Sequence, residues 1–277
     1  MSVWKKPALV AVSALSAFAI SACGVTPGAS EAPKQPTVLQ LLASDLKGSL
    51  LKAVDATDKT DSVTVTMTGT MAGEKISMKG VLDLGDPFKA DMTMTDAKGS
   101  TTSVRMIGAV VYTEIPEEGR TRTGGKRWMK MDLSGLGELT GTDFTKQFEN
   151  ADPVKQVKML LAIEGTTVVG QETVDGVPTV HYTVTTPVAT YLDQIDAARR
   201  DVTEQTLATQ GVKELTIDLW VDEQYRPRRA GLAMGAMGDM VIDYTDYDKA
   251  VTIESPPPAE TADFAEMLKG LQGLTTT

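Results

Sequence analysis

The feature that most constrains the fold is a strict alternation of apolar and polar residues that begins after Asp61. In SVTVTMTGT, Val63, Val65 and Met67 fall on one side of an extended chain and threonines fall on the other. This period of two predicts a β-strand with one apolar face. The alternation returns in KISMKGVLDL, FKADMTM, TSVRMIGAVVYTEI and KRWMKMDL, separated by turn sequences. The pattern predicts an antiparallel meander of about five strands with one covered face.

A second set of alternating segments occupies residues 165–253. GTTVVGQETV and VPTVHYTVTT flank Asp175-Gly176, a strong signal for a hairpin turn, and ELTIDLWVDE, PRRAGLAMGA and DMVIDYTDY follow. A sheet of this width twists and curls. The two sets together predict an α+β fold: one large curved antiparallel sheet, a half-barrel of about ten strands, with helices over its concave apolar face.

Segments with helical periodicity supply the cover. Residues 38–54 carry leucines at steps of three and four, Asp152-Pro153 is typical of a helix start, and residues 187–210 form a longer helical stretch. A last short helix follows the prolines at 256–258. The stripes predicted to face the sheet are Leu39, Leu42, Leu46 and Leu50; Val154, Val157, Leu160 and Leu161; Tyr191, Ile195, Ala198 and Val202; and Phe264, Met267, Leu268 and Leu271.

The apolar face is short of large rings and rich in methionine. Aromatic residues make up 5% of the chain, whereas it contains 14 methionines, several of them on the apolar strand faces. Methionine is unbranched and polarisable, so it adapts to irregular surfaces. One interpretation is a pliable cavity for a long-chain ligand, and the other is ordinary core filling. The residues predicted to line the cavity are Met67, Met78, Leu82, Met92, Met94, Met106, Val110, Leu160, Leu161, Ile217 and Leu219.

The N-terminus has the three parts of a secretory signal. Lys5 and Lys6 precede an uncharged stretch, and Ile-Ser-Ala then leads into Cys23, the only cysteine. The apolar stretch is too short to cross a bilayer as a helix. Ile-Ser-Ala-Cys resembles the lipobox of bacterial lipoproteins, which implies that the thiol of Cys23 takes a diacylglyceryl group. The alternative is an incidental cysteine at the end of a signal.

Three parts are therefore expected along the chain. Residues 1–22 are the signal peptide, and residues 23–37 are a lipidated tether whose Pro, Gly, Ser and Ala cannot bury enough surface to order it. Residues 38–272 form a single domain. Because only one cysteine is present, the domain has no disulfide and depends on its core.

Charge restricts the partners. The chain has 37 acidic and 27 basic residues, a formal net charge of −10. Such a chain is unsuited to nucleic acid or to a polybasic hold on anionic lipid, so its membrane contact is expected to come from the anchor. The densest basic stretch, RTRTGGKRW, holds Arg120, Arg122, Lys126 and Arg127. It is either a solvated hairpin tip or a contact for lipid phosphates.

The sequence carries no recognisable catalytic or metal motif. His181 is the only histidine, and its alternation with Val180 and Tyr182 predicts that it points to the polar face of a strand. No GxSxG motif surrounds a serine. DYTDYDKA, with Asp243, Asp246 and Asp248, lacks the glycine and distal glutamate of a calcium loop. We expect no enzyme activity, no metal and no cofactor.

In sum, these features resemble the LppX–LprA–LprF–LprG group of actinobacterial lipoproteins, which share the fold of the LolA and LolB carriers. The resemblance rests on the lipobox at Cys23, the low-complexity tether, the Thr/Val/Met meander with KRWMKMDL, and the LWVDEQYRPRRAGL stretch. It covers residues 38–270 in architecture. It implies a half-barrel with a hydrophobic cavity between sheet and helices, and no catalytic residues.

The resemblance implies a function in the cell envelope. The protein is expected to be anchored to the outer face of the plasma membrane through lipidated Cys23, to bind an acylated lipid or glycolipid, and to carry it within the envelope. The alternative is a non-enzymatic sensor or interaction module with a solid core that docks on another envelope protein. A hydrolase whose site has no recognisable motif is a third possibility.

Overall fold

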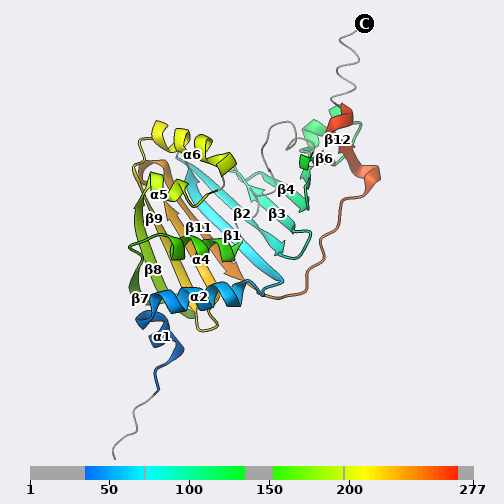
Figure 1. The fold of residues 1–277 in the computed structure, drawn as a ribbon. Helices are drawn as coiled ribbons and strands as arrows, with labels where there is room; N and C mark the ends of the chain where they lie inside the picture. The colour runs from blue at the N-terminus through cyan, green and yellow to red at the C-terminus, as the bar shows by residue number, and fades with distance from the viewer. Residues whose placement is uncertain (1–34, 72, 135–151, 196, 268–277) are drawn as a thin grey trace, which may run out of the picture. The chain divides into compact units, whose positions relative to one another are not determined.

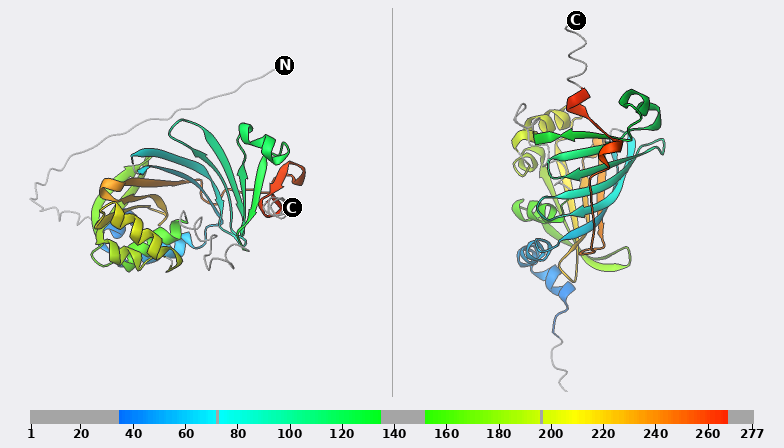
Figure 2. Two further views of the ribbon diagram at one scale, coloured as in Figure 1. Left: turned by 90° about the horizontal axis from the view of Figure 1, so that it is seen from above. Right: turned by 90° about the vertical axis from the view of Figure 1, so that its right-hand side faces the viewer.

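Twelve strands form one curved sheet that does not close on itself (Figures 1 and 2). The computed structural model describes residues 35–71, 73–134, 152–195 and 197–267. Contacts divide the chain into Met1–Gln35 and Pro36–Thr277, and the fold described is that of the second unit. The strands are β1 (Ser62–Met71), β2 (Glu74–Asp83), β3 (Lys89–Thr95), β4 (Thr101–Ile107), β5 (Val110–Glu114), β6 (Trp128–Asp132), β7 (Thr167–Val174), β8 (Val177–Pro187), β9 (Glu214–Asp222), β10 (Pro227–Ala233), β11 (Gly238–Thr245) and β12 (Thr261–Asp263).

Two antiparallel meanders make up the sheet, β1–β6 and β7–β11. Their order is β12-β6-β5-β4-β3-β2-β1-β11-β10-β9-β8-β7. The meanders meet where β1 pairs antiparallel with β11, with Met67 opposite Ile242. The two sets of alternating segments therefore form one continuous surface, which confirms the large curved antiparallel sheet. The strand number is twelve where the sequence predicts about ten.

One extra strand arises because the predicted strand at 101–115 is a hairpin. The turn between β4 and β5 begins at Gly108, whose φ of 55° is a left-handed conformation that glycine adopts freely. The pairing places Met106 opposite Val111. The prediction that Val110 and Tyr112 share the face of Met106 is therefore wrong, because the turn shifts the alternation by one residue.

The other extra strand, β12, pairs parallel with β6 at the far edge of the sheet. Residues 246–257 carry the chain there from the centre of the sheet (Figure 1). Arg105 in β4 donates from Nη1 to the Glu254 carbonyl at 2.8 Å along this crossing. The sequence predicts a short helix after the prolines, from Phe264 on, and does not predict β12 before it. Residues 264–267 are helical, and Leu268 and Leu271 of the predicted stripe lie outside the described residues.

The helices are α1 (Val38–Ser44), α2 (Leu46–Thr57), α4 (Pro153–Ala162), α5 (Val188–Leu192) and α6 (Ala197–Thr209), with 3-10 turns η1 (Glu117–Thr123), η3 (Gly235–Met237) and η4 (Pro258–Glu260). The α-helices lie on the concave side over the β7–β11 meander (Figure 2). α1 packs against β7 and β8, α4 against β9 and β10, and α5 against β8 and β9, while α2 packs against α4. The predicted cover of the concave face is thus concentrated on one half of the sheet.

The helix predicted at 38–54 is two helices that meet at Asp45. The Asp45 carboxylate caps α2 by accepting the Gly48 N–H at 3.0 Å. A Cβ on Gly48 would lie 2.1 Å from that carboxylate, so a larger residue here would make the Asp45 side chain shift from its capping position. Leu42 and Leu50 still face the core and are fully buried. The Tyr182 hydroxyl of β8 donates to the Leu42 carbonyl at 2.9 Å and fixes α1 to the sheet.

The helix predicted at 187–210 is also divided, into α5 and α6. Arg200 Nε donates to the Leu192 carbonyl at 2.9 Å and ties the two helices together. Leu207 anchors α6 in a small apolar cluster beside the sheet. Val202, predicted to face the sheet, is 68% exposed. The predicted stripe is wrong at this position because α6 packs through one end, and the side chain of Ala198 lies outside the described residues.

Candidate functional site: a cavity under the helical roof

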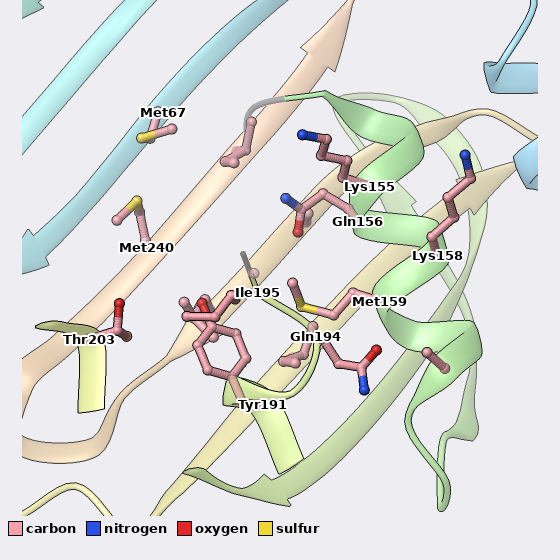
Figure 3. A pocket seen from close by; sticks show the side chains of 16 residues that line it. Met67, Lys155, Gln156, Lys158, Met159, Tyr191, Gln194, Ile195, Thr203 and Met240 are labelled. Carbon is pink, nitrogen blue, oxygen red and sulfur yellow. The ribbon is translucent and has the colours of Figure 1, made fainter. Parts of the chain in front are cut away.

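A cavity of about 750 Å³ lies between the helices and the concave face of the sheet. Its volume falls within the ~300–1,000 Å³ typical of small-molecule sites. Strands β1, β9, β10 and β11 form the floor, α4 forms one wall, and α5, α6 and the turn between them form the other (Figure 3). The lining residues are Met67, Ile217, Ala230, Gly231, Leu232, Met240 and Ile242 from the strands, and Lys155, Gln156, Lys158, Met159, Ala162, Tyr191, Gln194, Ile195 and Thr203 from the helices and the α5–α6 turn.

The floor follows directly from strand register. Met240, Leu232 and Ile217 stand opposite one another across β11, β10 and β9. Met67, Ile242 and Ala230 form the next row across β1, β11 and β10. Every second residue of these strands points to the concave side, so both rows present apolar side chains to the cavity. Figure 3 shows Met67 and Met240 on this floor, opposite the α4 side chains.

A small residue leaves the space open. Ala230 lies in its row between Ile242 of β11 and Leu219 of β9. Its methyl group fills far less volume than the side chain of either neighbour, and Met159 of α4 and Tyr191 of α5 line the same cavity. The described residues at this place therefore surround an open space, which favours the interpretation of a ligand cavity over that of a solid core.

The predicted lining residues divide into several groups. Met67 and Ile217 line the cavity. Leu82, Met92, Met106, Leu160 and Leu219 are buried in the main core, and Met78 and Leu161 pack partly buried against it. Met94 is 42% exposed. Val110 pairs with Ile107 on the opposite face and is not placed to line this side of the sheet.

Sequence reasoning did not select most of the floor residues. Met240 and Ile242 alternate in DMVIDYTDY just as Met92 and Met94 do in FKADMTM. The alternation shows that both pairs lie on an apolar face, but it does not show which part of that face the helices cover. The covered part depends on the long-range pairing of β1 with β11, for which no local pattern provides a signal.

The cavity is apolar at its floor and polar along its helical wall. Lys155, Gln156 and Lys158 lie along α4 with Met159, and Gln194 lies across from them at the end of α5 (Figure 3). Among the described residues that line the cavity, none is Asp or Glu. In the neighbouring core, burial raises the pKa of the Tyr182 and Tyr244 phenols, so both stay neutral. This arrangement can hold an amphiphile with its apolar part on the floor.

His181 lies on the opposite, polar face of the sheet, as predicted. Its Nδ1 is 3.0 Å from Glu172 Oε1 and its Nε2 is 2.8 Å from Asp218 Oδ1. Its ring stacks on Trp220 with centroids 4.1 Å apart, and Trp220 Nε1 donates to Glu172 at 2.7 Å. These hydrogen bonds, first that from Trp220, lower the pKa of Glu172. Both ring nitrogens are engaged, so the cluster works as a cross-strand brace.

The acidic and basic stretches singled out in the sequence are also engaged within the fold. Asp243 accepts from Arg229, Asp246 pairs with Lys249, and Asp248 pairs with Arg226. In the basic stretch, Arg120 and Arg127 both pair with Glu114, and Lys126 donates to the Ala259 carbonyl. Within the described ranges, no three His, Cys, Asp or Glu side chains are placed to hold a metal ion. None of the described helices is long and apolar enough to span a membrane.

Comparisons with known proteins identify the relatives. No protein-family model matches the chain. An uncharacterized 31.2 kDa protein encoded between rplA and rplJ in Streptomyces griseus is 31% identical over 224 residues, which cover 72% of this chain and 73% of that protein. A Streptomyces coelicolor protein provisionally named a lipoprotein is 28% identical over 240 residues, covering 79% and 75%.

Two solved structures share the fold. The lipoprotein LppX of Mycobacterium tuberculosis has a TM-score of 0.50 at 16% identity, over 76% of this chain and 98% of that chain. LprF of Mycobacterium bovis has a TM-score of 0.51 at 15% identity, over 76% and 96%. The chain therefore belongs to the family of the Streptomyces griseus protein and has the fold of the actinobacterial lipoproteins LppX and LprF, as its sequence resemblance predicted.

Proposed function

We propose that the protein is a lipid-anchored envelope protein that binds an acylated lipid or glycolipid in the cavity and carries it within the cell envelope. The observation that carries the proposal is the cavity of about 750 Å³ with an apolar strand floor and a polar helical wall. A long-chain ligand gains free energy by burying its methylenes on such a floor, at about 0.8 kcal/mol for each CH₂ group.

The proposed anchor and the cavity belong to one function. Cys23 lies outside the described residues, and its lipidation is supported by the lipobox resemblance and by the likeness to lipoproteins. Diacylglyceryl and further acyl chains would hold the protein at the outer face of the plasma membrane far more firmly than one chain. The tether at 23–37 would then let the cavity reach lipids or a receiving partner nearby.

The test is ligand capture by the mature chain, residues 23–277, produced unlipidated with Cys23→Ala. Native mass spectrometry after detergent-free purification should show bound acyl lipid, and added lipid should displace an apolar dye. Met240→Trp should weaken lipid binding about tenfold or more, because the indole occupies the cavity.

Val241→Trp is the matched control. Val241 is the next residue of β11, opposite Thr68 and Gly231, and its side chain points to the other face. It should leave lipid binding unchanged. A wild-type chain that neither carries lipid nor releases dye on lipid addition would contradict the carrier and favour a docking module.

A further inference from the structure

The charge around the cavity differs from that of the chain as a whole. The chain has ten more acidic than basic residues by formal net charge, yet its described cavity lining includes two lysines and no carboxylate. Both lysines, Lys155 and Lys158, come from α4, which lies across from Met67 and Met240 (Figure 3). A cleft lined by charges of one sign concentrates ligands of the opposite sign.

Lys158 forms an exposed ion pair that a ligand can displace. Lys158 Nζ lies 3.8 Å from Asp58 Oδ1 of the segment after α2, and the two side chains are 56% and 67% exposed. A pair this exposed contributes about 0–1 kcal/mol. A ligand group that reaches α4 can therefore compete with Asp58 for the Lys158 ammonium.

Polar side chains beside the lysines add hydrogen-bonding groups. Gln156 lies between them on α4 and Gln194 lies across the cavity. Ammonium groups and amide N–H groups are donors, and they match the oxygens of a phosphate or a carboxylate. The apolar floor of Met67, Met240 and Ile242 suits an alkyl tail. The complementary ligand is thus apolar at one end and anionic at the other.

We infer that the cavity selects acyl lipids whose head carries an anionic phosphate or carboxylate, which Lys155 and Lys158 bind at the α4 wall. The inference rests on the proposed lipid-binding function and narrows its ligand class. The acyl chain supplies most of the binding free energy on the floor, and the two lysines distinguish an anionic head from a neutral one of similar size.

The experiment compares ligands in which the head group and the eight-carbon acyl chains are varied separately. Dioctanoyl phosphatidic acid and octanoic acid present a phosphate and a carboxylate, dioctanoylglycerol is neutral, and glycerol 3-phosphate has the head without the tail. Binding to the mature chain is measured by titration calorimetry at 50 and 500 mM sodium chloride. The dissociation constant of phosphatidic acid should be at least about tenfold lower than that of dioctanoylglycerol. The reason is that hydrogen bonds to charged groups contribute more binding free energy than hydrogen bonds between neutral groups.

Two double substitutions isolate the lysines. Lys155→Gln with Lys158→Gln should remove the preference for the anionic head and its salt dependence, while dioctanoylglycerol binding stays unchanged. Lys155→Arg with Lys158→Arg should retain the preference. Lys47→Gln with Lys98→Gln changes the net charge equally at exposed positions outside the cavity lining and should have no effect. Thermal unfolding checks that each variant is folded.

Different outcomes separate this inference from the proposed function. If dioctanoylglycerol binds as tightly as phosphatidic acid, or the Gln pair leaves the anionic preference intact, the head-group selection is wrong and lipid binding stands. If no tailed lipid binds, the proposed function fails. If glycerol 3-phosphate binds as tightly as phosphatidic acid, the site takes a free phosphate and the acyl chain has no role.

Discussion

Asp222 shows how one buried carboxylate organises the turn between β9 and β10. It ends β9, is 2% exposed, and accepts the backbone N–H groups of Gln224 and Arg226 at 2.9 and 3.0 Å. The same turn holds Tyr225 at a φ of 60°, and the chain then enters β10. The WVDEQYRPRR stretch that supports the family resemblance is therefore a structural signature of this β9–β10 hairpin.

Asp222→Ala should lower the free energy of unfolding by about 2 kcal/mol, because two backbone amides lose their acceptor in a buried turn. Urea denaturation followed by circular dichroism measures the change. Asp55→Ala, at an exposed position of α2, should change stability by less than about 0.5 kcal/mol. Equal effects of the two substitutions would contradict the role of the turn.

The pH dependence of Asp222 follows from its burial, which raises its pKa against the hydrogen bonds that stabilise the carboxylate. Because the pKa of Asp222 is higher in the folded state, the folded state binds the proton more tightly than the unfolded state does. The free energy of unfolding therefore falls as pH rises from the unfolded-state pKa of ~3.9 through the folded-state pKa. Asp222→Asn keeps an acceptor oxygen without this penalty. Its stability relative to wild type should therefore rise over that window, measured by urea midpoints from pH 3 upward, and a flat difference would contradict the shift.

Individual elements owe their positions to contacts that join distant segments. Arg105 in β4 binds Asp91 of β3 at 2.7 Å and the Glu254 carbonyl of the crossing segment at 2.8 Å. Its guanidinium also lies over the Trp128 ring of β6 at 5.4 Å. β12 pairs with β6. The Arg105 side chain therefore joins β3, β4 and β6 to the segment that leads into β12.

Arg105→Met should loosen the crossing segment while leaving the sheet folded. Methionine keeps an unbranched apolar side chain but loses the donors to Glu254 and Asp91, at a cost of about 1–3 kcal/mol to local stability. Amide hydrogen exchange should accelerate at 253–263 and stay constant in β1. Lys89→Met, which removes a local ion pair with Asp83, is the control and should leave 253–263 unchanged.

How far the sequence predicts each element depends on whether its cause is local. Alternation predicted the strands and the apolar face because period two is a property of neighbouring residues. The β4–β5 turn was missed because Gly108 interrupts the alternation without any Pro or Asn beside it. Two long helices were predicted where Asp45 and the α5–α6 turn divide them. The cavity was predicted as a class of site, but its floor depends on which strands α4 covers, and that is a tertiary property.

The whole molecule separates three environments. The concave side is apolar, the cavity wall on α4 carries positive charge, and the opposite face carries ion pairs such as Arg229 with Asp243. The net charge of the chain is −10, so the chain has no general electrostatic attraction for anionic bilayers. The proposed function accordingly assigns the membrane anchor to Cys23 and ligand binding to the cavity.

Cys23→Ala should move the full chain from the membrane fraction to the soluble fraction, because it removes the thiol that would carry the proposed acyl chains. Fractionation and detection of the chain in the expressing bacterium measure it, with labelled palmitate reporting acylation of the wild type. Ser21→Ala, which keeps the lipobox pattern, is the control and should remain in the membrane. Retention of the Cys23→Ala chain in washed membranes would contradict the anchor.

Ala230 lines the cavity and stands in its row between Ile242 and Leu219, whose side chains are bulkier. If the cavity holds an acyl chain as proposed, a larger side chain at this one position would shorten the tail that fits. Relatives that place valine or leucine there should then accept shorter chains than those with alanine. The length of the accepted tail could in that case change by one substitution, with the strands and helices unaltered.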